Sequence, residues 1–429
     1  MTLGPPAASP PPPGVRVVMD ARPLQEPDRA PVTAAYLESL LGAFDRTVLP
    51  GESFVFLLQS DLDDPTARFE RLEVIGRRLL PPTRFLRSGS LVVDPILVRG
   101  ASLGAAWRAE RGGAAGAVYH AAGGAVPLAS RLPLVATLLD LAPWQLPRAY
   151  QRGLASRFGQ RLRAAILRDA AAVVVGTDAV AADARRLLRL RRGHVQVVPL
   201  APHEAFRASA PGSPGRTPAA DARAERERLG LSDRYFVYAG RYDARHDLPT
   251  LLRALAILGA GARPADLPAE VAWPPRVLLA GATPGDRASL ARSAAREGVG
   301  EALLYAPRLP WERVAVLVRG ARAALLPVVS EAAGPSVIDA LASGTPVVAS
   351  AVGALPELVG AGGILVEPRD PRRLAEALRT AWVDDAVHGR LAAAARERGA
   401  TLPNWDDVAR RTREVYAAVG RAAGRRSEG

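Results

Sequence analysis

The sequence predicts an α/β protein of two domains, each built around a parallel sheet. The chain has 429 residues, which is long for one hydrophobic core and suits two or three compact units. Short apolar runs alternate with segments of helical periodicity in two series, as in parallel sheets that are covered by helices. Between the two series, residues 208–221 are mostly Pro, Gly, Ser and Ala, a composition typical of an interdomain linker.

The composition narrows the class of protein. Apolar residues make up 48% of the chain and charged residues 23%, which predicts a folded, soluble protein. No apolar run approaches the roughly 18 residues that a membrane-spanning helix needs. Residues 1–14 are rich in proline and lack the basic start and apolar core of a signal peptide, so we expect a disordered tail and a cytoplasmic location. The absence of cysteine excludes disulfides and thiolate metal sites.

The net charge of +13 comes from 56 basic residues, all of which are arginine. Such a chain favours anionic partners, among them nucleotides, lipid head groups and nucleic acid. Aromatic residues make up only 5% of the chain and do not alternate with the arginines. The stacking platforms that bind single-stranded nucleic acid are therefore not expected, and we predict no nucleic-acid partner.

The first domain is expected over residues 15–207. Apolar runs predict its strands at residues 15–20, 53–60, 117–121, 133–140, 171–177 and 195–200. No G-x-G-x-x-G motif follows the first of these strands, which excludes a dinucleotide-binding dehydrogenase. His120 ends a predicted strand, where a buried structural role is favoured over a catalytic one.

A basic helix is predicted over residues 151–171. Leu154, Phe158, Leu162 and Ile166 recur at helical spacing, with arginines around them. The favoured interpretation is an apolar stripe that faces the core and a basic face in solvent. The alternative is a helix that lies on an anionic membrane surface.

The second domain is organised around residues 319–350, which read as strand, polar loop, short helix and strand. Ala323–Val329 is an apolar run typical of a buried parallel strand, and Glu331 lies in the loop that follows its carboxyl end. Gly334, Pro335 and Ser336 then open a helix. Glu331 is therefore expected at the carboxyl edge of the sheet and near a helix N-terminus, where open α/β sheets bind ligands.

Asp339 has two interpretations. The spacing Ser336-x-x-Asp339 fits a capping box, in which both side chains bind N–H groups of the first helical turn. The alternative is that the Asp339 carboxylate binds a ligand, as the segment around it suggests.

That segment runs from Glu331 through Gly334 and Asp339 into residues 340–350, ALASGTPVVAS. It resembles the E-x7-E segment of retaining GT-B glycosyltransferases of group 1, also called family 4. The similarity covers about residues 15–416 and is dense after Tyr235. It implies two Rossmann-like domains that face each other across a cleft, with a linker over 208–231, the second domain over 232–385, and C-terminal helices over 386–429 that return to the first domain.

The resemblance also implies roles in binding the donor sugar nucleotide. Glu331 is expected to hold hydroxyls of the donor sugar, and the turn at Gly334, Pro335 and Ser336 to offer backbone N–H groups to it. The second acid of the motif binds the ribose in the family. Here Asp339 stands in its place, one methylene shorter than the usual glutamate.

Residues 240–248 resemble the family segment G-R-x-x-x-x-K-N-L, whose arginine and lysine bind the donor diphosphate. Arg241 stands at the arginine position. His246 replaces the lysine, and Arg245 is a neighbouring cation that could substitute for it. Arg308, which follows a predicted strand at residues 302–306, is expected to border the nucleobase.

The first domain departs more from the family. Ala30–Tyr36 stands where a glycine-rich loop is usual, with Val32 and Ala34 in place of glycines. Leu139 replaces a histidine that lies near the reacting centre in the family, while the following Asp140 remains. Asp140 and Tyr36 are the residues that we expect on the acceptor side.

The predicted activity is a metal-independent, retaining transfer of a sugar from a nucleotide-diphosphate-sugar to a hydroxyl of a glycan, a lipid-linked molecule or a small molecule. Glu331 and Arg241 are the expected catalytic residues, no cofactor is predicted, and contact with the inner face of an anionic membrane is a further expectation. The alternative is a degenerate homologue that binds a nucleotide-sugar or a partner enzyme without turnover.

Overall fold

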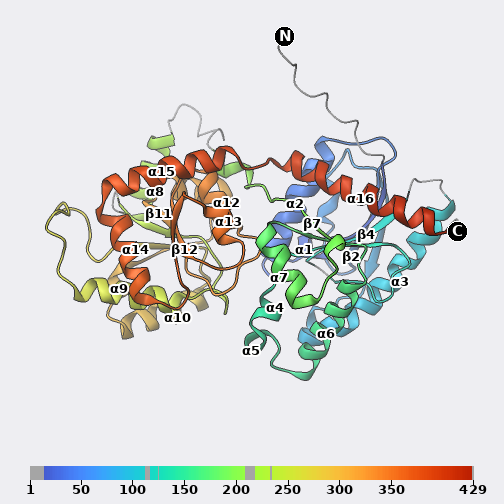
Figure 1. Ribbon diagram of the computed structural model, residues 1–429, viewed down its shortest axis with the longest axis horizontal. Helices are drawn as coiled ribbons and strands as arrows, with labels where there is room; N and C mark the ends of the chain where they lie inside the picture. Colours follow the sequence, from blue (N-terminus) through green and yellow to red (C-terminus); the bar gives the residue numbers. More distant parts are fainter. Residues whose placement is uncertain (1–13, 112–115, 124, 208–217, 232–233, 428–429) are drawn as a thin grey trace, which may run out of the picture. The chain divides into compact units, whose positions relative to one another are not determined.

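The computed structural model describes residues 14–427, except 112–115, 124, 208–217 and 232–233 (Figure 1). The chain forms two compact units, of which the first comprises residues up to Gly176, Ala181–Pro199 and the segment from Asn404, and the second comprises Thr177–Val180 and Leu200–Pro403. The predicted tail at 1–14 falls almost entirely outside the described residues, as do the first residues of the predicted linker.

The first unit contains a parallel sheet, whose described strands have the order β3-β2-β1-β4-β5-β6-β7. Their bounds are β1 (Arg16–Asp20), β2 (Ser53–Gln59), β3 (Val74–Leu80), β4 (Ala117–Ala122), β5 (Leu134–Thr137), β6 (Ala172–Val175) and β7 (Val195–Val197). All seven residues of β2 are buried, as expected of a strand with helices on both faces of its sheet. The edge strand β3 was not predicted, because its exposed and covered residues alternate without a continuous apolar run.

Helices cover both faces of this sheet. Their bounds are α1 (Arg22–Gln25), α2 (Pro31–Arg46), η1 (Pro65–Arg68), η2 (Arg84–Gly89), α3 (Ser90–Arg111), α4 (Ala142–Gln145), α5 (Pro147–Tyr150), α6 (Leu154–Arg168), α7 (Asp178–Leu188), η3 (Arg192–His194) and α16 (Trp405–Ser427). The last of these packs against α2 and β4. Its buried Arg413 binds the Glu52 carboxylate through two N–H groups, at 2.8 and 2.6 Å, a paired geometry that anchors α16 to the first unit.

The second unit contains a parallel sheet, whose described strands have the order β10-β9-β8-β11-β12-β13. Their bounds are β8 (Phe236–Tyr238), β9 (Val277–Ala280), β10 (Leu303–Ala306), β11 (Ala323–Leu326), β12 (Val347–Ser350) and β13 (Gly363–Val366). The strands expected at residues 302–306 and 323–329 are both present in shorter form. Leu251, Leu255 and Leu258 of α9 (Leu248–Ala260) are buried on this sheet, together with Trp382.

The remaining elements of the second unit correct two predicted boundaries. They are η4 (Glu204–Phe206), α8 (Pro218–Leu229), α10 (Pro284–Arg296), η5 (Gly300–Ala302), α11 (Trp311–Arg319), α12 (Pro335–Ala342), α13 (Leu355–Val359), α14 (Pro371–Val383) and α15 (Asp385–Ala400). Part of the predicted linker is the helix α8, which packs on α11 through an ion pair between Glu225 and Arg313 at 2.5 Å. α15 packs on α12 and α14, so only the last part of residues 386–429 joins the first unit.

Both sheets have a point at which the strand order reverses. In the first sheet this point lies between β1 and β4, and in the second sheet between β8 and β11. Loops that leave the carboxyl ends of such neighbouring strands diverge and leave room for a ligand. Among the helices of the described residues, none combines the length and the apolar character that a membrane span requires.

Candidate functional site

Two loops meet at the point of reversal in the second sheet. One follows β8 and carries Arg241, Arg245 and His246, and the other follows β11 and carries Glu331. Backbone hydrogen bonds join them: the Asp247 N–H donates to Pro327 O at 2.8 Å, and the Val329 N–H donates to Arg245 O at 2.8 Å. The structure therefore brings the two predicted donor-binding motifs, about 90 residues apart in sequence, to one edge of one sheet.

The Glu331 carboxylate is held in place by its own loop. Oε1 accepts hydrogen bonds from the N–H groups of Ala332 and Ala333 at 3.1 Å and of Gly334 at 2.9 Å. Of the turn that was expected to offer N–H groups to the donor sugar, Gly334 uses its N–H to bind Glu331. Oε2 accepts no hydrogen bond from the residues that the structure describes, so it is the oxygen that can accept one from a ligand hydroxyl.

A glycine fixes the backbone at Glu331. The Glu331 carbonyl accepts a hydrogen bond from the Ala354 N–H at 3.2 Å. Gly353 lies against the same carbonyl, with a φ of 54°, and a Cβ atom there would lie 1.9 Å from the Glu331 oxygen. Only glycine tolerates both this conformation and this approach, so the 353–354 turn sets the direction in which Glu331 points.

The helix that follows Glu331 begins at the predicted turn. Gly334 is the N-cap of α12 and has a left-handed φ of 61°, and Pro335 is the first helical residue. The Ser336 hydroxyl donates to the carbonyl of Ala239 at 2.7 Å. Ser336 thereby ties the start of α12 to the residue that follows β8, which makes it a positioning residue for both loops.

Asp339 does not form the predicted capping box with Ser336, because no side chain caps α12. Its Oδ1 accepts a hydrogen bond from the main-chain N–H of His203 at 2.9 Å. Desolvation raises the pKa of the Asp339 carboxyl to about 7, against the opposing effect of the His203 hydrogen bond. The residue is partly exposed, so the alternative interpretation as a ligand-binding acid stays a prediction.

The three predicted diphosphate-binding cations surround one carboxylate, that of Asp243. Its oxygens lie 3.3 Å from Arg241 Nε, 2.9 Å from an Arg245 guanidinium nitrogen and 3.0 Å from His246 Nδ1. Arg245 and His246 are buried, whereas Arg241 is partly exposed. Arg241 is therefore the cation of this group that a ligand in solvent can reach without a rearrangement of the loop.

Positive groups outnumber negative ones in the loop that follows β8. Burial by itself raises the pKa of the Asp243 carboxyl, but the hydrogen bonds and charges of His246 and Arg245 outweigh burial and hold the pKa well below its usual range. One carboxylate thus faces two permanently charged guanidinium groups and an imidazole. An excess of hydrogen-bond donors and positive charge at a sheet edge suits an anionic group such as a diphosphate.

Arg308 lies farther from these loops. It is exposed and follows β10 by two residues. β10 is the edge strand, two strands from β8, which corresponds to about 10 Å at the usual strand spacing. Arg308 therefore shares the carboxyl edge with Arg241 but is displaced along it, and its contact with a nucleobase stays a prediction.

The first unit has a pocket of its own, of about 270 Å³, at the carboxyl ends of β1, β2 and β4. The buried guanidinium of Arg22 lies in it between two carboxylates: it binds Asp20 at 2.8 and 2.9 Å and Asp94 at 3.0 Å. The Thr83 hydroxyl donates to the same Asp94 oxygen at 2.7 Å. Burial alone would lower the pKa of Arg22, but Asp20 and Asp94 raise it above its usual value.

Sequence reasoning missed this cluster. Asp20 and Arg22 were noticed only as the end of the first strand, and nothing in the pattern linked them to Asp94 on α3. The available signal was a carboxylate at the carboxyl end of the first strand of a parallel sheet, which is a position where ligands bind.

The two residues predicted for the acceptor side lie elsewhere. Asp140 is partly exposed, and its Oδ1 accepts a hydrogen bond from the Ala142 N–H at 2.8 Å at the start of α4; it does not line the pocket at β1 and β4. Tyr36 is buried in the core of the first unit, where burial raises the pKa of its hydroxyl to about 12. As placed, the Tyr36 side chain cannot contact an acceptor in solvent, which corrects the prediction.

His120 has the structural role that was favoured for it. It is fully buried, its Nδ1 lies 2.7 Å from the Tyr416 hydroxyl and its Nε2 lies 2.9 Å from the Thr137 hydroxyl. Desolvation lowers its pKa to about 3, so the ring is neutral at physiological pH and bonds α16 to β4 and β5. Within the described part of the chain, no three His, Asp or Glu side chains gather as metal ligands would.

The chain is similar to known proteins in sequence. Residues 233–384 match the family model described as glycosyl transferases group 1. A D-inositol 3-phosphate glycosyltransferase of Streptomyces griseus subsp. griseus is 36% identical over 211 residues, which make up 48% of this chain and 44% of that protein. The chain therefore spans less than half of the length of this curated relative.

Solved structures extend the likeness to most of the chain. A sucrose-phosphate synthase of Thermosynechococcus elongatus has a TM-score of 0.67 at 21% identity and covers 95% of this chain and 100% of its own. HepE of Anabaena, solved in complex with UDP and glucose, has a TM-score of 0.64 at 16% identity, with 94% and 100% covered. These likenesses confirm the predicted fold class. Residues 233–384 are therefore similar to group 1 glycosyltransferases, in a chain of GT-B fold.

Proposed function

We propose that this protein transfers a sugar from a nucleotide-diphosphate-sugar to an acceptor hydroxyl, with retention of the anomeric configuration and without a metal. The observation that carries the proposal is the junction of two loops at β8 and β11, which places the cations around Asp243 beside the fixed carboxylate of Glu331. A diphosphate and a sugar are adjacent groups of one donor molecule, and these adjacent loops offer positive charge to one and a hydrogen-bond acceptor to the other.

In this proposal Arg241 binds the diphosphate and stabilises the negative charge that develops on it as the bond to the sugar breaks. Positive groups held in place before the reaction stabilise such charge without the cost of reorganising solvent. Arg245 and His246 act mainly through Asp243, because both are buried against it. We assign the neutralisation of the diphosphate to these cations in place of a metal ion, and no other cofactor is proposed.

Glu331 orients the donor sugar. Three N–H groups hold Oε1, so Oε2 is fixed in direction and can accept a hydrogen bond from a sugar hydroxyl. Because the Glu331 side chain is already fixed, it loses little conformational entropy when a sugar hydroxyl binds to it. Asp339, one turn into α12, is assigned to the nucleotide ribose, and Arg308 to the side of the nucleobase.

The acceptor is assigned to the first unit, at the pocket formed by Asp20, Arg22 and Asp94. Carboxylates accept hydrogen bonds from hydroxyl groups, so a hydroxyl-rich glycan, a lipid-linked sugar or a polyol fits this pocket. The printed activity of the Streptomyces relative makes an inositol phosphate one member of that class. A peripheral position on the inner face of a membrane would bring the site to a lipid-linked acceptor.

A second candidate is a protein that binds the donor without turnover. Two observations favour it: the histidine position of the family holds the buried Leu139, and Arg245 and His246 are engaged with Asp243. The two candidates differ in turnover alone. Release of UDP from UDP-glucose in the presence of polyol and glycan acceptors supports transfer, whereas tight donor binding with no release supports the second candidate.

The donor site is tested by calorimetry with UDP and UDP-glucose on two variants and a control. Arg241→Ala should weaken both ligands by about 1.5 to 3 kcal/mol, because both contain the diphosphate. Glu331→Gln keeps an oxygen for the loop N–H groups but loses the charge, and it should weaken UDP-glucose by about 1 kcal/mol and leave UDP unchanged. Arg253→Ala, on the exposed side of α9, is the matched control. Equal losses for both ligands in Glu331→Gln would show that Glu331 is not a sugar ligand.

A further inference from the structure

The helix α6 buries mainly small and polar side chains and exposes large apolar ones. Its buried residues are Ser156, Gly159, Gln160, Ala164 and Leu167, of which four are small or polar. Leu154, in contrast, is 84% exposed and Phe158 is 58% exposed. The interpretation of the stripe from Leu154 to Ile166 as a core-facing surface is therefore wrong, since its first half points into solvent.

Close packing explains how α6 stays on the unit without burying these side chains. A Cβ atom at Gly159 would lie 2.5 Å from Cβ of Leu91 at the start of α3, so the two helices approach more closely than any larger residue permits. The Ser156 hydroxyl accepts a hydrogen bond from the Gly153 N–H at 3.1 Å and donates one to the Gly153 carbonyl at 2.8 Å, so it closes the first turn of the helix. The exposed leucine and phenylalanine are therefore not needed for the fold.

Neighbouring elements add to this surface. α6 packs against α3 and η2, which also pack against each other. Phe85 of η2 is 73% exposed, and Leu86 of η2 and Ile96 of α3 are exposed as well. We call these side chains the apolar face: Phe85, Leu86, Ile96, Leu154 and Phe158. Single exposed apolar residues are ordinary, but several on adjoining elements mark an interaction surface.

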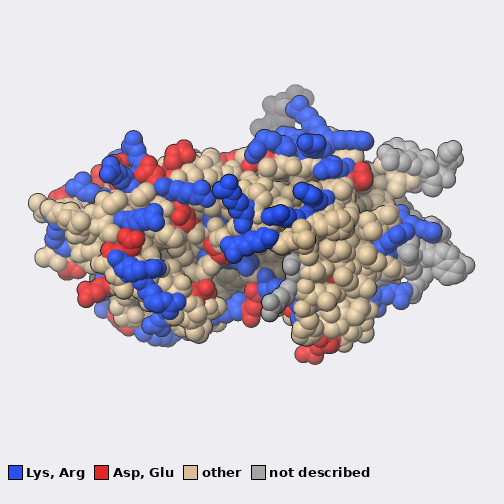
Figure 2. Space-filling model, turned by 90° about the horizontal axis from the view of Figure 1, so that it is seen from below, with Lys and Arg blue, Asp and Glu red and all other residues tan. Residues whose placement is uncertain are grey.

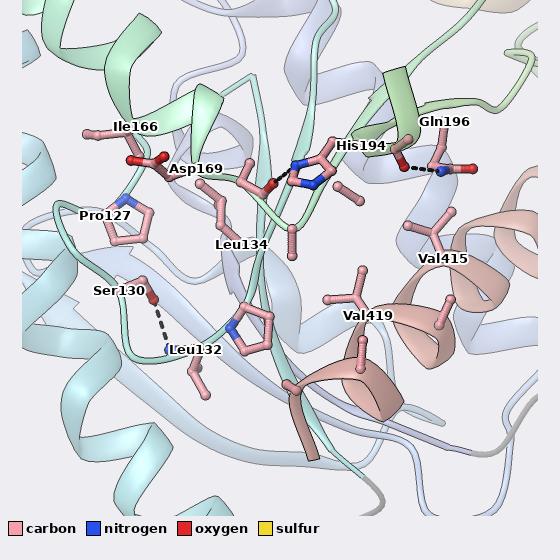
Figure 3. Close-up of a pocket in the computed structure, with 18 of the residues that line it drawn as sticks. Pro127, Ser130, Leu132, Leu134, Ile166, Asp169, His194, Gln196, Val415 and Val419 are labelled. Carbon is pink, nitrogen blue, oxygen red and sulfur yellow. Dashed lines mark hydrogen bonds between the residues drawn. The ribbon is translucent and has the colours of Figure 1, made fainter. Parts of the chain in front are cut away.

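The second half of the α6 stripe runs into a groove. Leu162 and Ile166 line a cavity of about 1140 Å³, whose opposite wall is formed by Val415 and Val419 of α16. Figure 3 shows Ile166 and Asp169 on one side of this cavity and the two valines on the other. The apolar stripe is therefore continuous from the exposed end of α6 into a recess of the same unit.

The charge along α5 and α6 has one sign. Residues 141–168 contain no Asp or Glu and contain six arginines, at positions 148, 152, 157, 161, 163 and 168. Five of them are exposed, and Arg163 instead donates to the Gly123 carbonyl. Arginine side chains also cover more of the face drawn in Figure 2 than acidic side chains do.

From these observations we propose that the apolar face docks on an anionic lipid bilayer, with Leu154, Phe158 and Phe85 entering the boundary between head groups and acyl chains. The exposed arginines of α5 and α6 then bind lipid phosphates. A helix that presents large apolar side chains beside arginines has the layered chemistry of a bilayer surface. Each arginine near such a surface strengthens binding by about fivefold. This inference does not depend on the reaction proposed above.

A sedimentation assay with the full chain tests the inference. Vesicles of phosphatidylcholine with roughly 30 to 40% phosphatidylglycerol are compared with vesicles of phosphatidylcholine alone, because the attraction of the arginines requires anionic lipid. Wild type should bind the anionic vesicles at least tenfold more tightly. Leu154→Ser/Phe158→Ser should lower this affinity by at least tenfold, and Arg157→Gln/Arg161→Gln by about twentyfold or more. Ile257→Ser, an exposed residue of α9 in the second unit, should bind like wild type.

The variants alter exposed side chains, and equal thermal midpoints with wild type establish that they fold. Failure of wild type to bind anionic vesicles would overturn the inference, as would a Leu154→Ser/Phe158→Ser variant that binds as well as wild type. Light scattering tests whether a second copy of the chain covers the apolar face instead. If wild type self-associates without binding vesicles, and Leu154→Ser/Phe158→Ser is monomeric, the face is an interface between copies and the membrane proposal is wrong.

Discussion

The two sheets carry polar clusters at equivalent places, and the clusters have opposite charge arrangements. In the second unit, at the reversal between β8 and β11, one carboxylate is surrounded by Arg241, Arg245 and His246. In the first unit, at the reversal between β1 and β4, Arg22 lies between Asp20 and Asp94. The same topology thus presents an excess of cationic groups in one unit and an excess of carboxylates around the buried cation in the other.

This difference separates the two kinds of ligand by chemistry. An anionic diphosphate is attracted by N–H donors and positive charge that a ligand can reach, which the second unit offers at the partly exposed Arg241. At the inner end of the first pocket a phosphate would meet an Arg22 already neutralised by two acids, whereas a hydroxyl group finds carboxylate acceptors there. The contrast between these two clusters supports the proposed division into a donor unit and an acceptor unit.

The largest effect is expected from breaking the cluster in the first unit. Arg22→Ala leaves Asp20 and Asp94 close together without their shared cation, and loss of one partner of a buried ion pair costs about 3 to 5 kcal/mol. We expect a loss of this size in the free energy of unfolding, measured by urea titration of the transition that reports the first unit. Arg29→Ala is the control, because Arg29 is exposed and its Glu26 partner is 3.9 Å away; it should change stability by less than about 0.5 kcal/mol. A small loss in Arg22→Ala would mean that the two carboxylates are well solvated.

The equivalent change in the second unit should separate stability from binding. Asp243→Asn removes the charge that compensates Arg245 and His246, and hydrogen bonds to charged groups contribute about 1.5 to 3 kcal/mol. The unfolding free energy should fall by that amount. Binding of UDP should become about fivefold tighter, because the competing carboxylate is gone, which corresponds to about 1 kcal/mol.

Calorimetry and urea unfolding on the same preparation measure both quantities for Asp243→Asn. Glu297→Gln is its control, since Glu297 pairs with Arg253 at 3.8 Å on the surface of the same unit. Weaker binding of UDP to Asp243→Asn would indicate that Asp243 is needed to orient the cations toward the diphosphate, and the contrast between the clusters would then rest on geometry more than on net charge.

How well the sequence predicted these two sites depended on how each is built. The proposed donor site comes from two short continuous segments, so the sequence alone could single out Glu331 and Arg241. The pocket of the first unit assembles Asp20, Asp94 and Arg163 from three distant elements, and no local pattern links them. Tertiary contacts decide such a site, and a single sequence does not record them.

The errors in the predicted packing have a similar cause. Helical periodicity identified the apolar stripe of α6 correctly but could not tell which face packs, because Gly159 and Ser156 allow the small side to be buried. The edge strand β3 lacks a continuous apolar run and was missed. The capping box at Asp339 does not form, because α12 begins at Pro335 with Gly334 as its N-cap. Asp339 Oδ1 accepts instead from the His203 N–H, which comes from a segment 136 residues away.

The units should also differ in how stability responds to pH. Asp339 in the second unit has a pKa raised from 3.8 to about 7, so its contribution is complete below pH 3.8 and is lost as the pH rises toward 7. Asp339→Asn removes this loss while keeping an acceptor for the His203 N–H. We expect the variant to be more stable than wild type above pH 7, on the order of 1 to 2 kcal/mol after allowance for solvent near this partly exposed residue.

His120 in the first unit should act in the opposite direction. Its pKa is lowered from 6.5 to about 3, so its contribution is complete above pH 6.5 and is lost as the pH falls toward 3. Thermal midpoints of wild type and Asp339→Asn between about pH 5 and 8.5, a range that contains the ordinary pKa of histidine and the raised pKa of Asp339, separate the two effects. An Asp339→Asn difference that does not grow with pH would show that the carboxyl titrates at its ordinary value.

The smallest effect is expected for Tyr36→Phe, which tests whether the first unit uses this residue for the acceptor. The Tyr36 hydroxyl lies 3.4 Å from that of Thr137, a long contact, and its ring packs on Trp405 at 5.8 Å. The ring stays in the variant, so stability should fall by no more than about 0.5 kcal/mol, and the KM for the acceptor should not change. Tyr416→Phe is the matched comparison, because it removes a 2.7 Å bond to the fully buried His120 and should cost about 1 to 3 kcal/mol by leaving Nδ1 unsatisfied. A rise in the acceptor KM for Tyr36→Phe alone, at unchanged stability, would return Tyr36 to the acceptor site and would mean that the first unit opens around α2 when it binds.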